Sequence, residues 1–193
     1  MPHQQRAPRQ PRRHVITYQD LCRAHTQVTR ELKALGFWHH RLEHIEVCLI
    51  PASLVCYGWY QGHIYIPALT GAQLSDLVVG RHTRLTDVLR HEWAHAVADQ
   101  WPLLMNTKRF EREFGGPYES VEAIREYDPD HHLTQYAATM PCEDFAEVFH
   151  YYLRHKGRLP ARLQDKPQIA GKWQFVDWLS CRITRRPRRL KVS

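Results

Sequence analysis

The chain has 193 residues, enough for one domain of ordinary size with a sizeable buried core. It is 43% hydrophobic and 24% charged, which is typical of a folded globular protein and excludes a wholly disordered one. No run of 18 apolar residues occurs, and the basic N-terminus is not followed by the apolar segment of a secretory signal. Five cysteines without a C-x-x-C pair argue against a disulfide framework and a cysteine-based zinc site. We therefore expect a cytoplasmic protein without a transmembrane segment.

Positive charge is concentrated at the two ends of the chain. Residues 1–14 contain four arginines, residues 182–193 contain five arginines and one lysine, and neither segment contains an acidic residue. Since the net charge of the whole chain is +7, the body over 15–181 is net negative. This distribution predicts one domain over 15–181 between two basic disordered tails. Such tails are either solvated termini or weak contacts for nucleic acid or an anionic surface.

The first part of the chain predicts one helix followed by strands. Thr17, with Asp20 three residues later, resembles a capping box, and apolar residues at helical spacing follow until Gly36. Alternating apolar residues then predict three strands, the last two joined as a hairpin at Gln61-Gly62; the strands cover 45–49, 54–60 and 63–67.

After Gly71 the pattern is one of helices separated by loops that contain proline and glycine. The predicted helices cover 72–79, 84–100, 107–114, 119–126, 143–156 and 172–182. Strands followed by helices indicate an α+β domain with a small, mostly antiparallel sheet and a helical half.

The strongest chemical signal lies in the predicted helix over 84–100, where His91, Glu92 and His95 form an H-E-x-x-H motif. Residues four apart share one helix face, so both imidazoles can bind one metal ion, and Glu92 can polarise a water on that ion. Two neutral imidazoles with a carboxylate suit zinc, and an open fourth position suits catalysis. The alternative is an exposed helix with two surface histidines, and a third ligand is needed to decide.

Carboxylates near the start of the predicted helix 143–156 are the candidates for that third ligand. Glu143 and Glu147 share a face of a helix that is otherwise rich in aromatic residues, and a buried carboxylate needs a partner such as a metal ion. Asp144 points about 100° away from Glu143 and has a shorter reach. Helical geometry does not choose between Glu143 and Glu147, and both also suit an exposed helix surface.

The sequence resembles the compact gluzincin metallopeptidases, the family that includes the catalytic domain of anthrax lethal factor, the Pro-Pro endopeptidases and Mlc titration factor A. The resemblance covers residues 85–180 and rests on HEWAHAVAD at 91–99, NTKRFEREF at 106–114, YAATMPCEDFAEVF at 136–149 and KPQIAGKWQFVDWL at 166–179. The N-terminal half matches only in its arrangement. The resemblance implies a zincin-like fold whose helical half carries the H-E-x-x-H helix and the ligand-glutamate helix.

In that family a tyrosine precedes the glutamate ligand by seven residues, which is the separation of Tyr136 and Glu143. The resemblance therefore implies that Glu92 is the general base and that Tyr136 donates to the developing oxyanion. It makes Glu147 a carboxylate that hydrogen-bonds a ligating histidine. The ligands it implies for Zn²⁺ are His91, His95 and Glu143.

The sequence departs from the family pattern at two positions: Ala94 stands where a glycine is frequent, and Asp144 stands where an aromatic residue follows the ligand glutamate. We expect a zinc-dependent metallopeptidase that hydrolyses protein or peptide substrates, with the predicted hairpin offering an edge strand for strand addition. The alternative is a nucleic-acid-associated protein with arginine-rich tails and a structural or vestigial zinc site. A structural site normally has four protein ligands, whereas the sequence offers three and a glutamate base, which favours the enzyme.

Of six further histidines, His150 extends the face of Glu143 and Glu147 by one turn and is a candidate hydrogen-bond partner of a ligand. The others lie in polar or turn-like segments and are expected at the surface: His39, His40, His131, His132 and His155. Aromatic residues in apolar helical patterns are expected in the core: Trp93, Trp173, Phe175 and Trp178.

Overall fold

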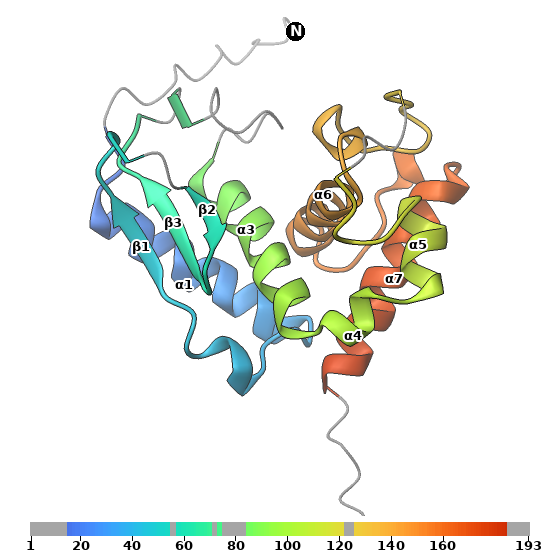
Figure 1. Cartoon of the computed structure of the whole chain (residues 1–193), viewed down its shortest axis with the longest axis horizontal. Helices are drawn as coiled ribbons and strands as arrows, with labels where there is room; N and C mark the ends of the chain where they lie inside the picture. The colour runs from blue at the N-terminus through green and yellow to red at the C-terminus, as the bar shows by residue number, and fades with distance from the viewer. Residues whose placement is uncertain (1–14, 55–56, 71–72, 75–83, 122–125, 185–193) are drawn as a thin grey trace, which may run out of the picture.

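The structure is a computed structural model, and it describes residues 15–54, 57–70, 73–74, 84–121 and 126–184 (Figure 1). The described part is an α+β domain in which a three-stranded sheet and helix α1 precede a mainly helical half. The α-helices are α1 (Tyr18–Ala34), α3 (Leu85–Gln100), α4 (Pro102–Met105), α5 (Lys108–Phe114), α6 (Pro141–Arg154) and α7 (Pro167–Thr184). The strands are β1 (Val47–Ile50), β2 (Gly58–Tyr60) and β3 (His63–Pro67).

Helix α1 begins at the capping box that the sequence predicts. The hydroxyl oxygen of Thr17 accepts from the backbone N–H of Asp20 at 3.2 Å, and the Asp20 carboxylate accepts from the N–H of Thr17 at 3.1 Å. These two bonds satisfy amide groups that the first turn leaves without intrahelical partners. The chain turns after the helix at Gly36, whose φ of 79° suits glycine.

The sheet has the strand order β1-β3-β2. β2 and β3 form the predicted antiparallel hairpin, and its turn places Gln61 and Gly62 at φ values of 48° and 83°. β1 pairs with β3 in parallel, so the sheet is mixed and the prediction of a mostly antiparallel sheet is wrong. The reason is that β2 returns the chain along the outer edge, which leaves β3 running beside β1 in the same direction.

The predicted helices at 84–100 and 107–114 correspond to α3 and α5, and those at 143–156 and 172–182 correspond to α6 and α7. Helix α6 starts two residues earlier than expected because Pro141 occupies the first helical turn, where a proline needs no N–H partner. Helix α7 extends to Thr184, so residues 182–184 are helical. The segment 1–14 lies outside the described residues.

Two parts of the helical half differ from the prediction. One is the short helix α4, which begins at Pro102 directly after α3 and was not predicted. Residues 119–121 are not helical; a turn in which Ser120 N–H donates to the carbonyl of Pro117 occupies this place, and residues 122–125 lie outside the described part. Of the helix expected over 72–79, the description covers only residues 73 and 74, which are helical.

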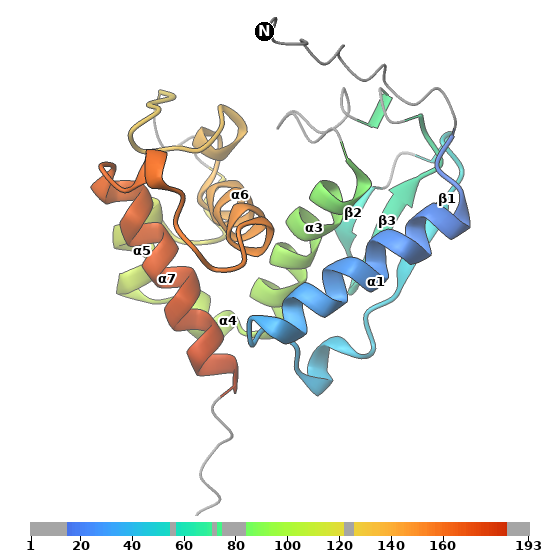
Figure 2. The ribbon, with the colours of Figure 1, turned by 180° about the vertical axis from the view of Figure 1, so that it is seen from behind.

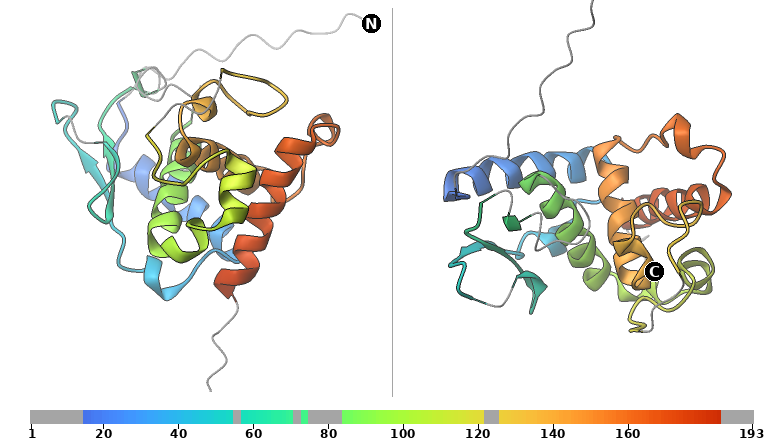
Figure 3. Two further views of the ribbon diagram at one scale, coloured as in Figure 1. Left: turned by 45° about the vertical axis from the view of Figure 1, so that its right-hand side comes forward. Right: turned by 90° about the horizontal axis from the view of Figure 1, so that it is seen from above.

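Helix α3 lies at the centre of the domain, and this position determines what its side chains contact. It packs against α1 and β2 on one side and against α6 on the other (Figures 2 and 3). Trp93 and Val97 are fully buried, and most of the helix is inaccessible around its whole circumference. Trp173 and Phe175 also lie in the core as predicted, whereas Trp178 is only partly buried.

A buried ion-pair cluster fixes the start of α3 against α1. The guanidinium of Arg90 donates to both carboxylate oxygens of Glu31, at 2.7 and 2.8 Å, and also to Asp87 at 2.5 Å. Bidentate pairs of this kind add geometric specificity, so the rotation of α3 about its axis is well determined. None of the described helices combines the length and the hydropathy that crossing a bilayer requires.

Candidate metal centre

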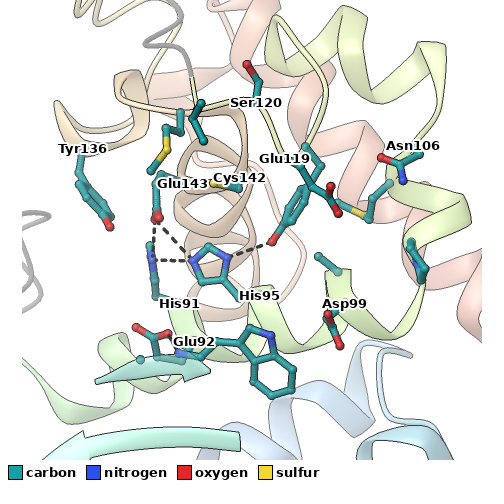
Figure 4. A pocket seen from close by; sticks show the side chains of 18 of the residues that line it. His91, Glu92, His95, Asp99, Asn106, Glu119, Ser120, Tyr136, Cys142 and Glu143 are labelled. Carbon is teal, nitrogen blue, oxygen red and sulfur yellow. Dashed lines mark hydrogen bonds and ion pairs between the residues drawn. The ribbon is translucent and has the colours of Figure 1, made fainter. Parts of the chain in front are cut away.

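Three potential ligand atoms from α3 and α6 converge at one point (Figure 4). His91 Nε2 lies 3.0 Å from Glu143 Oε2 and 3.2 Å from His95 Nε2, and His95 Nε2 lies 3.5 Å from Glu143 Oε2. Two ligands about 2.1 Å from a tetrahedral ion are themselves about 3.4 Å apart, so these separations fit one small cation. Two imidazole nitrogens and one carboxylate oxygen form a donor set that suits zinc.

The two helices place these atoms for separate local reasons. His91 and His95 are one turn apart on α3 and therefore share a face. Glu143 lies in the first turn of α6, where the helix dipole favours a negative charge. His91 and Glu143 are both buried, so each needs the polar partner that the other supplies.

Glu147 contacts the opposite ring nitrogen of His91. Its Oε1 lies 2.9 Å from His91 Nδ1, and its Oε2 accepts from the hydroxyl of Thr134 at 3.1 Å. Burial alone lowers the pKa of His91, but hydrogen bonds to Glu143 and Glu147 outweigh it and raise the pKa to about 10. The surroundings of this imidazole therefore favour a positive charge. Of the two glutamates that share a face of α6, Glu143 faces the Nε2 atoms and Glu147 faces the Nδ1 atom.

The carboxylate of Glu92 is held by the edge strand β2. The backbone N–H of Trp59 donates to Glu92 Oε2 at 2.8 Å. Gly58, with a φ of 84°, lies so close to this carboxylate that a Cβ atom there would be 2.9 Å from Oε2. The glycine therefore permits both the backbone conformation and the close approach of β2 to the glutamate.

Tyr136 lies in the short 3₁₀ helix at Tyr136–Ala138, directly before α6. Its ring centroid is 5.7 Å from that of His91. Burial, followed by the negative charge of Glu143 and a hydrogen bond to it, raises the pKa of Tyr136 well above its ordinary value. The phenol therefore keeps its proton at neutral pH and can act as a hydrogen-bond donor.

A cavity of about 510 Å³ opens beside the three ligand atoms. Glu92 and Tyr136 both line it, together with residues of β2 and of the segment that follows α3. Asp99 and Glu119 line the part of the cavity beyond His95 (Figure 4). A volume of this size accommodates several atoms of a peptide on either side of one bond.

Two contacts at the centre were not predicted from the sequence. One is the bond from Trp59 N–H to Glu92, since a backbone donor leaves no compositional signal. The other is Tyr118, whose hydroxyl lies 3.0 Å from His95 Nδ1. The preceding Gly115-Gly116-Pro117 marks a turn in the sequence, but nothing in the spacing relates Tyr118 to a histidine 23 residues earlier.

Two histidines differ from expectation, whereas Asp144 points away from Glu143 as helical geometry predicts. His150 does not approach a ligand through Nε2; that atom lies 3.3 Å from Asp87 Oδ1, at the other end of α6 from the centre. Asp144 is fully buried in an ion pair with Lys172 of α7, on a face of α6 away from Glu143. His132 is only 4% exposed, so its prediction as a surface histidine is wrong.

Comparison of the chain with models of known protein families, with curated proteins and with solved structures gives no significant match. The arrangement of the described residues therefore carries the functional argument.

Proposed function

We propose that this protein is a zinc-dependent metallopeptidase with a zincin-like arrangement of its α3 and α6 helices. The observation that carries the proposal is the convergence of His91 Nε2, His95 Nε2 and Glu143 Oε2 on the wall of a cavity that Glu92 also lines. The order of the motifs, which resembles that of the compact gluzincins, supports the same assignment. Three protein ligands leave a coordination position for water or substrate, as in catalytic rather than structural zinc sites.

Bound zinc supplies a Lewis acid for the substrate carbonyl and lowers the pKa of a water molecule toward about 7. Glu92 accepts a proton from the attacking water and passes it to the leaving amine. The N–H of Trp59 holds Oε2 of this carboxylate, which fixes the direction in which Oε1 points. The Tyr136 hydroxyl donates a hydrogen bond to the developing oxyanion, and Glu147 maintains the orientation of His91 from its Nδ1 side.

A peptide is the substrate class that suits the edge of the sheet. β2 pairs with β3 on one side, and its other side faces Glu92 and the cavity. Since the N–H of Trp59 is directed to Glu92, the carbonyl of the same residue points to the same side and can accept from a substrate amide. Strand addition of this kind uses main-chain groups that every peptide has.

The alternative is a nucleic-acid-associated protein in which the basic ends of the chain bind and the metal is structural. It predicts that affinity for random duplex DNA falls steeply with salt and that deletion of residues 1–14 and 185–193 removes this slope. It also predicts that Glu92→Gln leaves the affinity for DNA unchanged, because a structural metal site does not require a general base.

Zinc content and proteolysis of two variants test the proposal. Elemental analysis of the purified full chain should give one zinc per molecule, and His91→Ala should give almost none. Glu92→Gln should keep the zinc and the Tm of the wild-type protein but lose nearly all hydrolysis of an unfolded protein substrate. Full hydrolysis by Glu92→Gln, or a wild-type protein that excludes zinc, contradicts the proposal.

A further inference from the structure

Tyr118 is the residue at the centre that neither the motifs nor the proposed mechanism uses. Its hydroxyl oxygen lies 3.0 Å from His95 Nδ1, and its side chain also lines the cavity. His91 has Glu147 at the equivalent ring nitrogen, so both histidines of the candidate centre have a side-chain partner on the Nδ1 side, and Glu147 and Tyr118 differ in chemistry.

The ring of Tyr118 is fixed by its surroundings. Edge-to-face contacts join it to Phe110 of α5, at a centroid distance of 5.6 Å, and to Phe145 of α6, at 6.1 Å. The backbone around it forms a turn closed by the bond from Ser120 N–H to the Pro117 carbonyl at 3.0 Å. A ring held between two aromatic side chains has few rotamers available. Its hydroxyl is therefore already next to His95 before a metal binds, and binding costs little further side-chain entropy of Tyr118.

The chemistry of the contact depends on which nitrogen carries the ring hydrogen. A metal ion on Nε2 requires the hydrogen on Nδ1, and this N–H then donates to the phenol oxygen of Tyr118. A phenol has an ordinary pKa of about 10 and is therefore neutral near pH 7. A neutral acceptor fixes the tautomer and the ring plane of His95, and it adds no charge to a centre that already contains several carboxylates.

We propose that Tyr118 is a positioning residue that holds His95 in the tautomer and orientation required for zinc binding. This inference rests on the proposed zinc site. It concerns the affinity of the site for the metal and assigns Tyr118 no role in the attack of water on the scissile bond. Loss of such an outer partner typically weakens metal binding by about 10–100-fold.

The test compares Tyr118→Phe with a matched control, Tyr152→Phe. Tyr152 is a buried tyrosine of α6 whose hydroxyl donates to Asp177 at 2.8 Å, so its replacement also removes one buried phenol hydrogen bond, away from the candidate centre. Zinc affinity of each full-length protein is measured by competition with a chromophoric chelator. The ring nitrogen shifts of His95 are measured by NMR on the zinc-loaded proteins, with Glu147→Gln as the comparison for His91.

Tyr118→Phe should bind zinc at least tenfold more weakly than the wild-type protein, and the Nδ1–H signal of His95 should shift or exchange rapidly with water. Tyr152→Phe should change neither quantity. Zinc affinity within threefold of wild type in Tyr118→Phe overturns the inference, and so does a weakened affinity with an unchanged His95 signal. A wild-type protein that does not bind zinc contradicts the proposed function instead, so the two failures are distinguishable.

Discussion

Gly58→Ala tests whether the close approach of β2 to Glu92 is needed for the proposed role of Glu92 as general base. Gly58 has a φ of 84°, a conformation that costs a residue with a Cβ atom about 1–2 kcal/mol. The added Cβ would also lie 2.9 Å from Glu92 Oε2 and 3.3 Å from its Cδ atom. A carboxylate at the end of a side chain can move away from this contact at small cost in stability, but it then leaves its bond to Trp59 N–H.

The expected result is a modest loss of stability together with a large loss of activity. The backbone strain corresponds to a decrease in Tm of roughly 2–8 °C for a domain of this size. Displacement of a catalytic group by a fraction of an ångström to 1 Å lowers turnover by up to about 10²-fold. Zinc content should stay at the wild-type value, because the atoms nearest to the added methyl group belong to Glu92 and not to a proposed zinc ligand.

Gly62→Ala is the matched control for this experiment. Gly62 has a φ of 83° in the turn between β2 and β3, and nothing lies within 4 Å of a Cβ atom added there. It therefore repeats the backbone strain without the contact to Glu92. Both variants are compared by thermal unfolding, zinc content and kcat/KM. If Gly58→Ala and Gly62→Ala lose activity equally, strain in the hairpin explains the loss, and the reasoning about Glu92 is refuted.

Four further variants, three at the candidate centre and one at the buried His132, test three more predictions. Tyr136→Phe should retain zinc and KM while kcat falls about 10²–10³-fold, and an unchanged kcat would leave the tyrosine with a packing role only. Glu143→Ala should contain almost no zinc after dialysis against a moderate chelator and Glu147→Ala should remain partly loaded; the reverse order would exchange their roles. His132→Gln should reduce the loss of stability in acid. Burial, and after it the charge of Lys172, lowers the pKa of His132 from 6.5 to about 4. As the pH falls from 6.5 to 4, the unfolded chain therefore binds a proton at this residue that the folded protein does not bind, and the folded state becomes less stable. Between pH 7 and pH 4.5, urea unfolding should show that the wild-type protein loses more free energy of unfolding than the variant, by up to about 3 kcal/mol. Equal losses in the two proteins would contradict a lowered pKa of His132.

Local patterns in the sequence were sufficient to predict the elements that depend on interactions between residues a few positions apart. The capping box at Thr17 and the hairpin turn at Gln61-Gly62 formed as predicted, since each depends on residues a few positions apart. The helix that carries His91 and His95 was also predicted, because apolar residues surround the motif along its length. Its burial on all sides follows from its central position and was not visible in the pattern.

Several features that depend on contacts between distant segments could not be predicted from local patterns. The parallel pairing of β1 with β3 depends on which edge of the sheet β2 occupies, and the alternation of side chains is the same in either arrangement. Nothing in the sequence indicated that Asp144 would be buried in an ion pair with Lys172, 28 residues later. The contact between Tyr118 and His95 likewise depends on the packing of α5 against α6, which brings a turn residue to the candidate metal centre.

Digestion of a degenerate peptide library, followed by mass spectrometry, measures whether the proposed centre hydrolyses peptide bonds. The zinc-loaded protein, the chelator-treated protein and Glu92→Gln are compared at equal concentration. We expect new peptide termini only with the zinc-loaded wild-type protein, and we expect them to return when zinc is restored to the chelated sample. A fully zinc-loaded wild-type protein that cleaves no peptide, or cleavage that persists in Glu92→Gln, would contradict the proposed function.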